Sequence, residues 1–244
     1  MMADGRPFLS TRSIPIIVFA LLTAAFAVAA TMQLGVLVRY GHMSALAERL
    51  EKSEKISEPL IHSYALQAAD IVTDGICTSD VVMAGATVVL ADLDRLDPVA
   101  DYDRWAAALE AADRYFRHAV SCSPTNGNFW LRLAMVRQAV AERPEEIARL
   151  MEQSVRWAPA EADILVGRLV LWNKVGPATL LASKALVQHD LDTLLRYGDS
   201  SELAPVIRTV RKNLLPYVHA IVLLLPSDRV ELLAKAGVSL STLQ

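Results

Sequence analysis

The residues of this chain that could do chemistry are few, and two cysteines are the most reactive of them. Cys77 and Cys122 are the only cysteines in 244 residues. His118 precedes Cys122 by four positions, so the two side chains would share one face of a helix. Thiolate and imidazole are zinc ligands, but a zinc site needs three or four convergent ligands. We therefore predict no metal site and no cofactor.

Motifs of the common enzyme classes are missing from the sequence. It contains no glycine-rich phosphate loop, no G-x-S-x-G nucleophile motif and no H-E-x-x-H zinc motif. Carboxylate pairs such as Glu145 and Glu146 stand at an expected helix start, where they interact favourably with the helix dipole. We therefore predict no catalytic residues. The formal net charge of −3 also argues against a nucleic-acid partner, because phosphates require a basic surface.

One small basic ridge is a further polar feature. Arg208, Arg211 and Lys212 have the i, i+3, i+4 spacing of a single helix face. Such a ridge can bind an anionic partner or lipid headgroups. It can equally be an ordinary solvated helix face, which is the commoner case. The sequence leaves both interpretations open.

The elements that must position these residues are predicted to be helices. The chain is 53% hydrophobic with only 10 Gly and 11 Pro, which favours packed helices over a β-sandwich or barrel and excludes wholesale disorder. From Met43 onward, apolar residues recur at the helical spacing. The Val-rich stretch 80–95 could form a strand by propensity, but its length and its helical neighbours favour a helix. We expect an all-α fold.

An uncharged apolar run from Ile14 to Val38 predicts a membrane-spanning helix. At about 1.5 Å per residue, the run is long enough to cross a hydrocarbon core of about 30 Å. We predict a short tail over 1–13 and a transmembrane signal-anchor helix over 14–38. A cleaved signal peptide is the alternative, because the A-V-A tripeptide at 27–29 resembles a cleavage site. The apolar run continues well past that point, which favours an uncleaved anchor.

The charges that flank the run disagree about orientation. Arg6 and Arg12 precede it, whereas Arg39 follows it, and further basic residues alternate with glutamates just beyond. A short tail before a large domain is the usual layout of a signal anchor. We expect a single-pass protein of an inner (plasma) membrane, with its tail inside and its domain outside. Residues 39–57 would be a juxtamembrane helix or linker, and 58–244 the helical domain.

Caps and breakers divide that domain into successive helices. The spacing predicts helices over 58–73, 80–95, 102–121, 178–197 and 201–214. A nearly all-apolar run from Tyr217 to Leu225 is too short to span a bilayer and predicts a buried helix, and a last helix begins after Ser227. We expect four residues of the helix over 178–197 to face the core, namely Leu180, Leu181, Ala185 and Leu194.

Seven residues around one helix junction have the spacing of a known repeat. Small residues let two helices approach closely, an aromatic residue fills the gap between neighbouring hairpins, and a proline ends the second helix. These residues are Ala112, Phe116, Ala119, Pro124, Trp130, Leu133 and Ala134. Through them the segment 79–174 resembles the tetratricopeptide-repeat family, although Arg137, Ile147, Leu165 and Arg168 depart from the repeat pattern. The resemblance implies a short solenoid of helical hairpins with a concave binding face.

An up-and-down stack of helices would place the two cysteines at the same end. Cys77 precedes the helix predicted over 80–95 and Cys122 follows the helix over 102–121, so two helices separate them. A disulfide can then form in an exported domain, and two ordinary buried thiols are the alternative.

Together these features predict a membrane-anchored helical-repeat scaffold that mediates protein–protein interaction at the cell envelope. Its partners would be one or more proteins and, through residues 14–38, the membrane itself. The alternative is an accessory component of surface-polysaccharide biosynthesis or export that contacts glycan or an envelope enzyme. Aromatic side chains exposed in the groove would favour this alternative.

Overall fold

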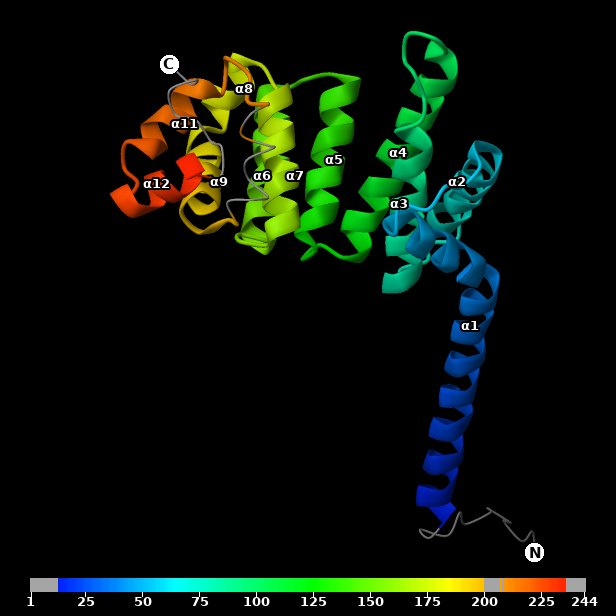
Figure 1. Cartoon of the computed structure of the whole chain (residues 1–244). Coiled ribbons are helices and arrows are strands. Elements are labelled where there is room, and N and C mark those ends of the chain that lie inside the picture. Colours follow the sequence, from blue (N-terminus) through cyan, green and yellow to red (C-terminus); the bar gives the residue numbers. More distant parts are fainter. Residues whose placement is uncertain (1–12, 200–206, 208, 236–244) are drawn as a thin grey trace, which may run out of the picture.

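Helices form every regular element in the part of the chain that the structure describes. The computed structural model describes residues 13–199, 207 and 209–235, and within these ranges it contains no strand. Figure 1 shows the helices side by side in a row, with α1 (Ser13–Glu51) projecting from the row at one end. The Val-rich segment forms helix α3 (Ser79–Leu93), as its helical neighbours predicted.

Helix α1 is continuous over 39 residues and has two environments. Residues 15–39 are exposed apart from the half-buried Val36, and Phe26 has 75% of its surface exposed. The helix is long and apolar enough to cross a membrane. Beyond this stretch Tyr40 and Met43 are completely buried. The segment predicted as a separate juxtamembrane helix is thus the C-terminal part of α1, and only a short connection follows Glu51.

The buried end of α1 packs into a core made with the next three helices. These are α2 (Glu58–Thr73), α3 and α4 (Tyr102–Cys122), and α1 lies directly against α3. The hydroxyl group of Tyr115 on α4 donates a hydrogen bond of 2.7 Å to the carbonyl oxygen of Val82 on α3. Burial raises the pKa of the Tyr115 phenol. This contact crosses α3 directly over Gly85.

Helix α5 (Gly127–Val140) has apolar residues on both faces because it separates two hydrophobic cores. Phe129 and Leu133 belong to the core formed with α1–α4. Leu131 and Ala134 belong to a second core formed with α6 (Pro144–Trp157), α7 (Ala162–Lys174) and the helices beyond them. A helix buried on both faces carries no single apolar stripe. Helix α5 therefore joins the two halves of the row through apolar packing.

The predicted helix over 178–197 is interrupted in the structure. It forms α8 (Pro177–Ala182) and α9 (Lys184–Tyr197), with a turn at Ser183. Helix α8 packs mainly on α6, whereas α9 packs on α7, and the break allows both contacts. Leu180 and Leu194 are buried as predicted, but Leu181 and Ala185 are exposed. The carboxylate of Glu142 also accepts a hydrogen bond from the backbone N–H of Gly176, just before α8.

The predicted helix over 201–214 lies partly outside the described residues, and residues 209–214 are irregular and turn structure. The side chain of Asn173 explains this difference. Its Nδ2 donates to the carbonyl oxygen of Thr209 at 2.8 Å, and its Oδ1 accepts from the N–H of Arg211 at 2.6 Å. These bonds use backbone groups that a helix would need. Two short helices follow, α11 (Leu215–Val222) and α12 (Ser227–Lys235).

The second core contains an ion pair with no solvent exposure. Arg168 on α7 and Asp190 on α9 are both fully buried, and the guanidinium Nε lies 2.9 Å from the carboxylate. The Nη1 of Arg168 donates to the carbonyl oxygen of Ala158, and the indole N–H of Trp172 donates to Asp190. Every partner of the two charges is therefore a protein group. Arg168 stands where the repeat pattern predicts leucine, and its polar contacts link α7 with α9 and with the α6–α7 loop.

Replacing Gly85 with alanine tests the crossing of α3 and α4. The new Cβ would lie within 2.2 Å of the present position of the Tyr115 hydroxyl oxygen and within 2.9 Å of Ile71 Cδ1. We expect Gly85→Ala to destabilise the fold by about 1–3 kcal/mol, as overpacking does. Thermal unfolding of the full chain in detergent, followed by circular dichroism, measures this loss. Gly41→Ala is the control, because nothing lies within 4 Å of its new Cβ.

Removing one member of the buried ion pair should destabilise the second core. Asp190→Ala leaves the Arg168 charge buried without a carboxylate, which costs about 3–5 kcal/mol. Because a buried pair can be exchanged for apolar residues at little cost, the double variant Arg168→Met, Asp190→Leu should recover part of the loss. Chemical unfolding of the single and double variants measures both effects. An Asp190→Ala variant as stable as the parent protein would contradict this role of the pair.

Candidate functional site

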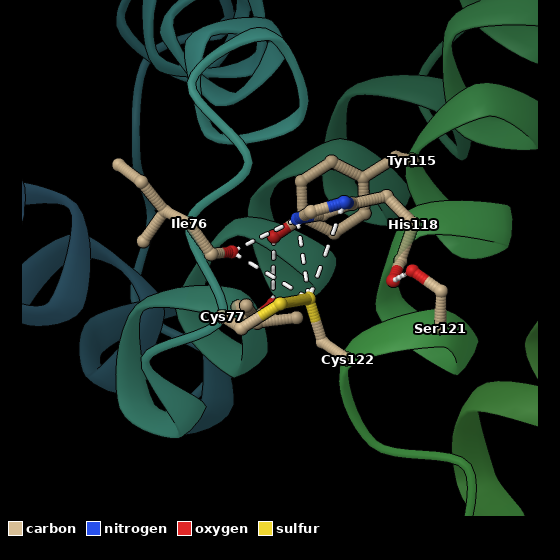
Figure 2. The surroundings of a disulfide bond; sticks show 7 residues. Ile76, Cys77, Tyr115, His118, Ser121 and Cys122 are labelled. Carbon is tan, nitrogen blue, oxygen red and sulfur yellow. Dashed lines mark hydrogen bonds between the residues drawn. A yellow bond between two sulfur atoms is a disulfide. The ribbon is translucent and has the colours of Figure 1, made fainter.

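The two cysteines form a disulfide in the structure. Cys77 lies just before α3 and Cys122 ends α4, with 5.1 Å between their Cα atoms (Figure 2). His118 lies beside the bond, with its Nε2 at 3.4 Å from Cys122 Sγ and at 2.8 Å from the carbonyl oxygen of Ile76. Cys77, His118 and Cys122 thus converge, their ligand atoms all lying within 4.8 Å of one another. With both sulfurs bonded to each other, the group presents one imidazole rather than three metal ligands.

The loop that carries Cys77 is also attached to α1. The guanidinium of Arg39 forms ion pairs of 2.9 Å with Asp70 and 2.6 Å with Asp74, near the C-terminal end of α2. Hydrogen bonds to these two carboxylates raise the pKa of Arg39. The hydroxyl group of Thr78 lies 3.4 Å from the amide oxygen of Gln33. The α2–α3 loop is therefore fixed to α1 on one side and to α4 on the other.

The predicted basic ridge lies only partly within the described residues. Arg211 and Lys212 are exposed in the irregular segment before α11, and Arg208 lies outside the described residues. The i, i+3, i+4 spacing requires a helix, and the hydrogen bonds of Asn173 hold the chain at Thr209 and Arg211 in another conformation. Arg211 and Lys212 therefore do not lie on a helix face.

A cavity of about 310 Å³ between α3, α4, α5 and α7 is the best candidate for a binding site. Apolar side chains, among them Leu90 and Leu93 from α3 and Trp105 from α4, share its walls with polar ones. Arg132 from α5 and Lys174 from the end of α7 add positive charge, and Asp94 just after α3 adds a negative charge. An apolar cavity with a few charged groups is the typical composition of a ligand site. We call this cavity the α3–α7 groove.

Arg132 is the unusual residue of the α3–α7 groove. Its guanidinium is partly buried, which lowers its pKa, while the charge of Asp94 acts in the opposite direction. Its Nη1 contacts Met135 Sδ at 3.7 Å, and within the described ranges Arg132 has no ion pair. The sequence analysis missed this residue. The signal that could have found it is a charge between two apolar residues, Leu131 and Leu133, both of which are buried in α5.

A histidine–aspartate pair that the sequence did not predict connects α2 with α3. The Nδ1 of His62 lies 3.1 Å from a carboxylate oxygen of Asp92, although 30 residues separate the two in the sequence. A histidine oriented by an aspartate can activate a nucleophile. Among the residues described by the structure, no serine, threonine or cysteine side chain is hydrogen-bonded to His62. The pair therefore acts in this structure as a tertiary contact between two helices.

The chain matches no protein-family model, and comparisons with curated proteins and with solved structures give no match either.

The disulfide predicts that the domain lies in an oxidising compartment. Disulfides persist in oxidising compartments and are rare in the cytosol. In cells treated with an alkylating reagent before lysis, we expect Cys77 and Cys122 to be protected until a reductant is added. Mass spectrometry of the digested protein measures this directly. If both cysteines are alkylated in the sample that received no reductant, the bond is contradicted. That result would favour a domain on the cytosolic side.

Proposed function

We propose that this protein is a single-pass, membrane-anchored helical scaffold of the cell envelope that holds a protein partner in the α3–α7 groove. The observation that carries the proposal is the groove itself, where a partly buried guanidinium stands among apolar side chains. Such a cavity fits a partner segment that brings an acidic group next to an apolar side chain.

The tetratricopeptide-like arrangement is part of this proposal, and the packing around α4 and α5 supports it. Ala112, Phe116 and Ala119 of α4 are completely buried in the core to which α5 also contributes. Trp130 is half-buried, and its indole N–H donates a hydrogen bond of 2.7 Å to the carbonyl oxygen of Pro124. The residue at the start of one hairpin thus contacts the turn that ends the previous one. Helix α5 also packs on both α6 and α7, as stacked hairpins require.

The membrane relation in the proposal is supported by the exposed part of α1. Large apolar side chains surround this part of the helix, including Phe19 and Met32, and such a surface is stable only when it is covered. A bilayer covers it on all sides. The Cys77–Cys122 bond favours a domain on the oxidising, extracytoplasmic side of an inner membrane.

Contact with glycan is the second candidate function. The specific observation in its favour is Trp105, whose indole lines the α3–α7 groove. In this version the protein is an accessory component of surface-polysaccharide biosynthesis or export. Apart from Trp105, the described lining of the groove contains no aromatic side chain. A platform for several sugar rings would need more, so we prefer a protein partner.

Reversing the charge in the groove tests the proposed function. Arg132→Glu should abolish the retention of a partner that the unchanged full chain, in detergent, captures from its native membranes after crosslinking. The reason is that the new carboxylate repels an acidic segment. Arg149→Glu, at an exposed position on α6 outside the groove, is the matched control and should retain the partner. Equal retention by both variants would contradict the groove as the binding site. Loss of glycan binding in Trp105→Ala, with protein partners unaffected, would favour the second function.

A further inference from the structure

Several loops lie together on the side of the row from which α1 projects. Gln33 on α1 contacts Thr78, and the adjacent Ser79 lines a polar hollow with Asn126, Trp157 and Glu161. This hollow connects the α2–α3 loop with the α4–α5 and α6–α7 loops. These loops therefore lie along one side of the helical row, formed by the ends of successive helices, and Figure 1 shows α1 extending away from that same side. We call it the proximal end.

The proximal end continues to the C-terminal half of the row. Ala160 and Ala162, at the α6–α7 junction, line a second cavity of about 320 Å³ together with Tyr197 at the end of α9. The guanidinium of Arg229 on α12 donates to the carbonyl oxygens of Leu195 and Gly198. The junction of α11 and α12 is thereby held beside the end of α9.

The helix that leaves the proximal end has no flexible connection to the body of the chain. Tyr40 directly follows the exposed stretch and Met43 lies about one turn further on, and both are completely buried. Arg39 is tied to α2 by two ion pairs. Because α1 continues as one helix through this region, the direction of its exposed part also fixes the orientation of the helical row.

The contact between Gln33 and Thr78 also sets the depth of the proximal end. Residues 15–32, which precede this contact, extend about 27 Å at 1.5 Å per residue. This length is close to the roughly 30 Å of a hydrocarbon core. With that segment in the bilayer, the loops of the proximal end lie at the level of the lipid headgroups.

The exposed side chains of the proximal end suit this level. Tyr197 has 81% of its surface exposed and Trp157 has 39%, and tyrosine and tryptophan prefer the membrane–water interface. At the corner of α11 and α12, Leu223 is 85% exposed. Charges of both signs stand nearby, such as Arg156 beside Trp157 and Glu161 in the polar hollow. Apolar and aromatic contacts therefore suit this end better than attraction to anionic headgroups.

We infer that the proximal end lies on the surface of the bilayer that α1 crosses, and that Trp157 and Tyr197 insert at the headgroup level. This inference rests on the proposed membrane span. The α3–α7 groove is lined by Leu93 and Lys174, which lie at the ends of α3 and α7 that are farther from the proximal end. The groove is then held away from the lipid, where a partner can approach it through water.

Photocrosslinking to lipid tests the inference. The full chain, with p-benzoylphenylalanine at one chosen position, is reconstituted in nanodiscs of phosphatidylcholine and, separately, of a phosphatidylcholine–phosphatidylglycerol mixture. We expect lipid adducts at Trp157 and Tyr197. The matched controls are Tyr102 and Val140, at the helix ends on the side of the row opposite the proximal end. They are 64% and 57% exposed and should give no adduct above background. Mass spectrometry of the digested protein detects the adducts.

Phe26, in the exposed part of α1, is the fifth labelled position. It distinguishes failure of the surface contact from failure of the proposed membrane span. Adducts at Phe26 but not at Trp157 or Tyr197 would overturn the surface contact and leave the span intact. No adduct at Phe26 would overturn the span and the surface contact together. Adducts of equal yield on both sides of the row would show non-specific labelling rather than a proximal contact, and would also overturn the inference. Adducts that form only in the phosphatidylglycerol mixture would show that headgroup charge, not apolar insertion, holds this end.

Discussion

The continuity of α1 is the constraint on which the rest of the structure depends. The same helix exposes a ring of large apolar side chains along its first part and buries Tyr40 and Met43 along its last part. The last part lies in a protein core, and in the proposed arrangement a bilayer covers the first part. Because the helix does not break between them, the way in which it enters the membrane would then determine the position of the domain.

The interior of the domain shows how the row of helices that follows the exposed part of α1 is held together. Helix α5 belongs to both cores, so the helices beside α1 and those near the C-terminus are packed against one common element. Close approach depends on small residues such as Gly85, over which Tyr115 reaches the backbone of α3. The Arg168–Asp190 pair links α7 with α9 by bonds that have directions, whereas apolar contacts alone allow sliding.

The α3–α7 groove and the disulfide differ in what they require from the chain. The disulfide joins two adjacent helical units and leaves its sulfurs without thiol chemistry, so it stabilises the end of the domain nearest to α1. The groove keeps a guanidinium partly away from water, which costs free energy in the isolated protein. A partner carboxylate would offset that cost on binding, and this is the physical reason to propose the groove, rather than the cysteines, as the binding site.

The sequence by itself determined the features that depend on local periodicity and composition. These are the all-helical fold, the long apolar helix at the N-terminus, the bounds of α2, α3 and α4 to within two residues, and the cysteines at one end of the stack. Tertiary structure decided the features that depend on contacts between distant residues. The break at Ser183 follows from packing on two different helices, and the turns before α11 follow from hydrogen bonds to Asn173. The environment of Arg132 likewise depends on α3, α4 and α7, whose residues lie as far as 42 positions from it in the sequence, as Leu90 does. Local patterns carry the period of a helix, but they do not carry the identity of the groups that packing brings against it.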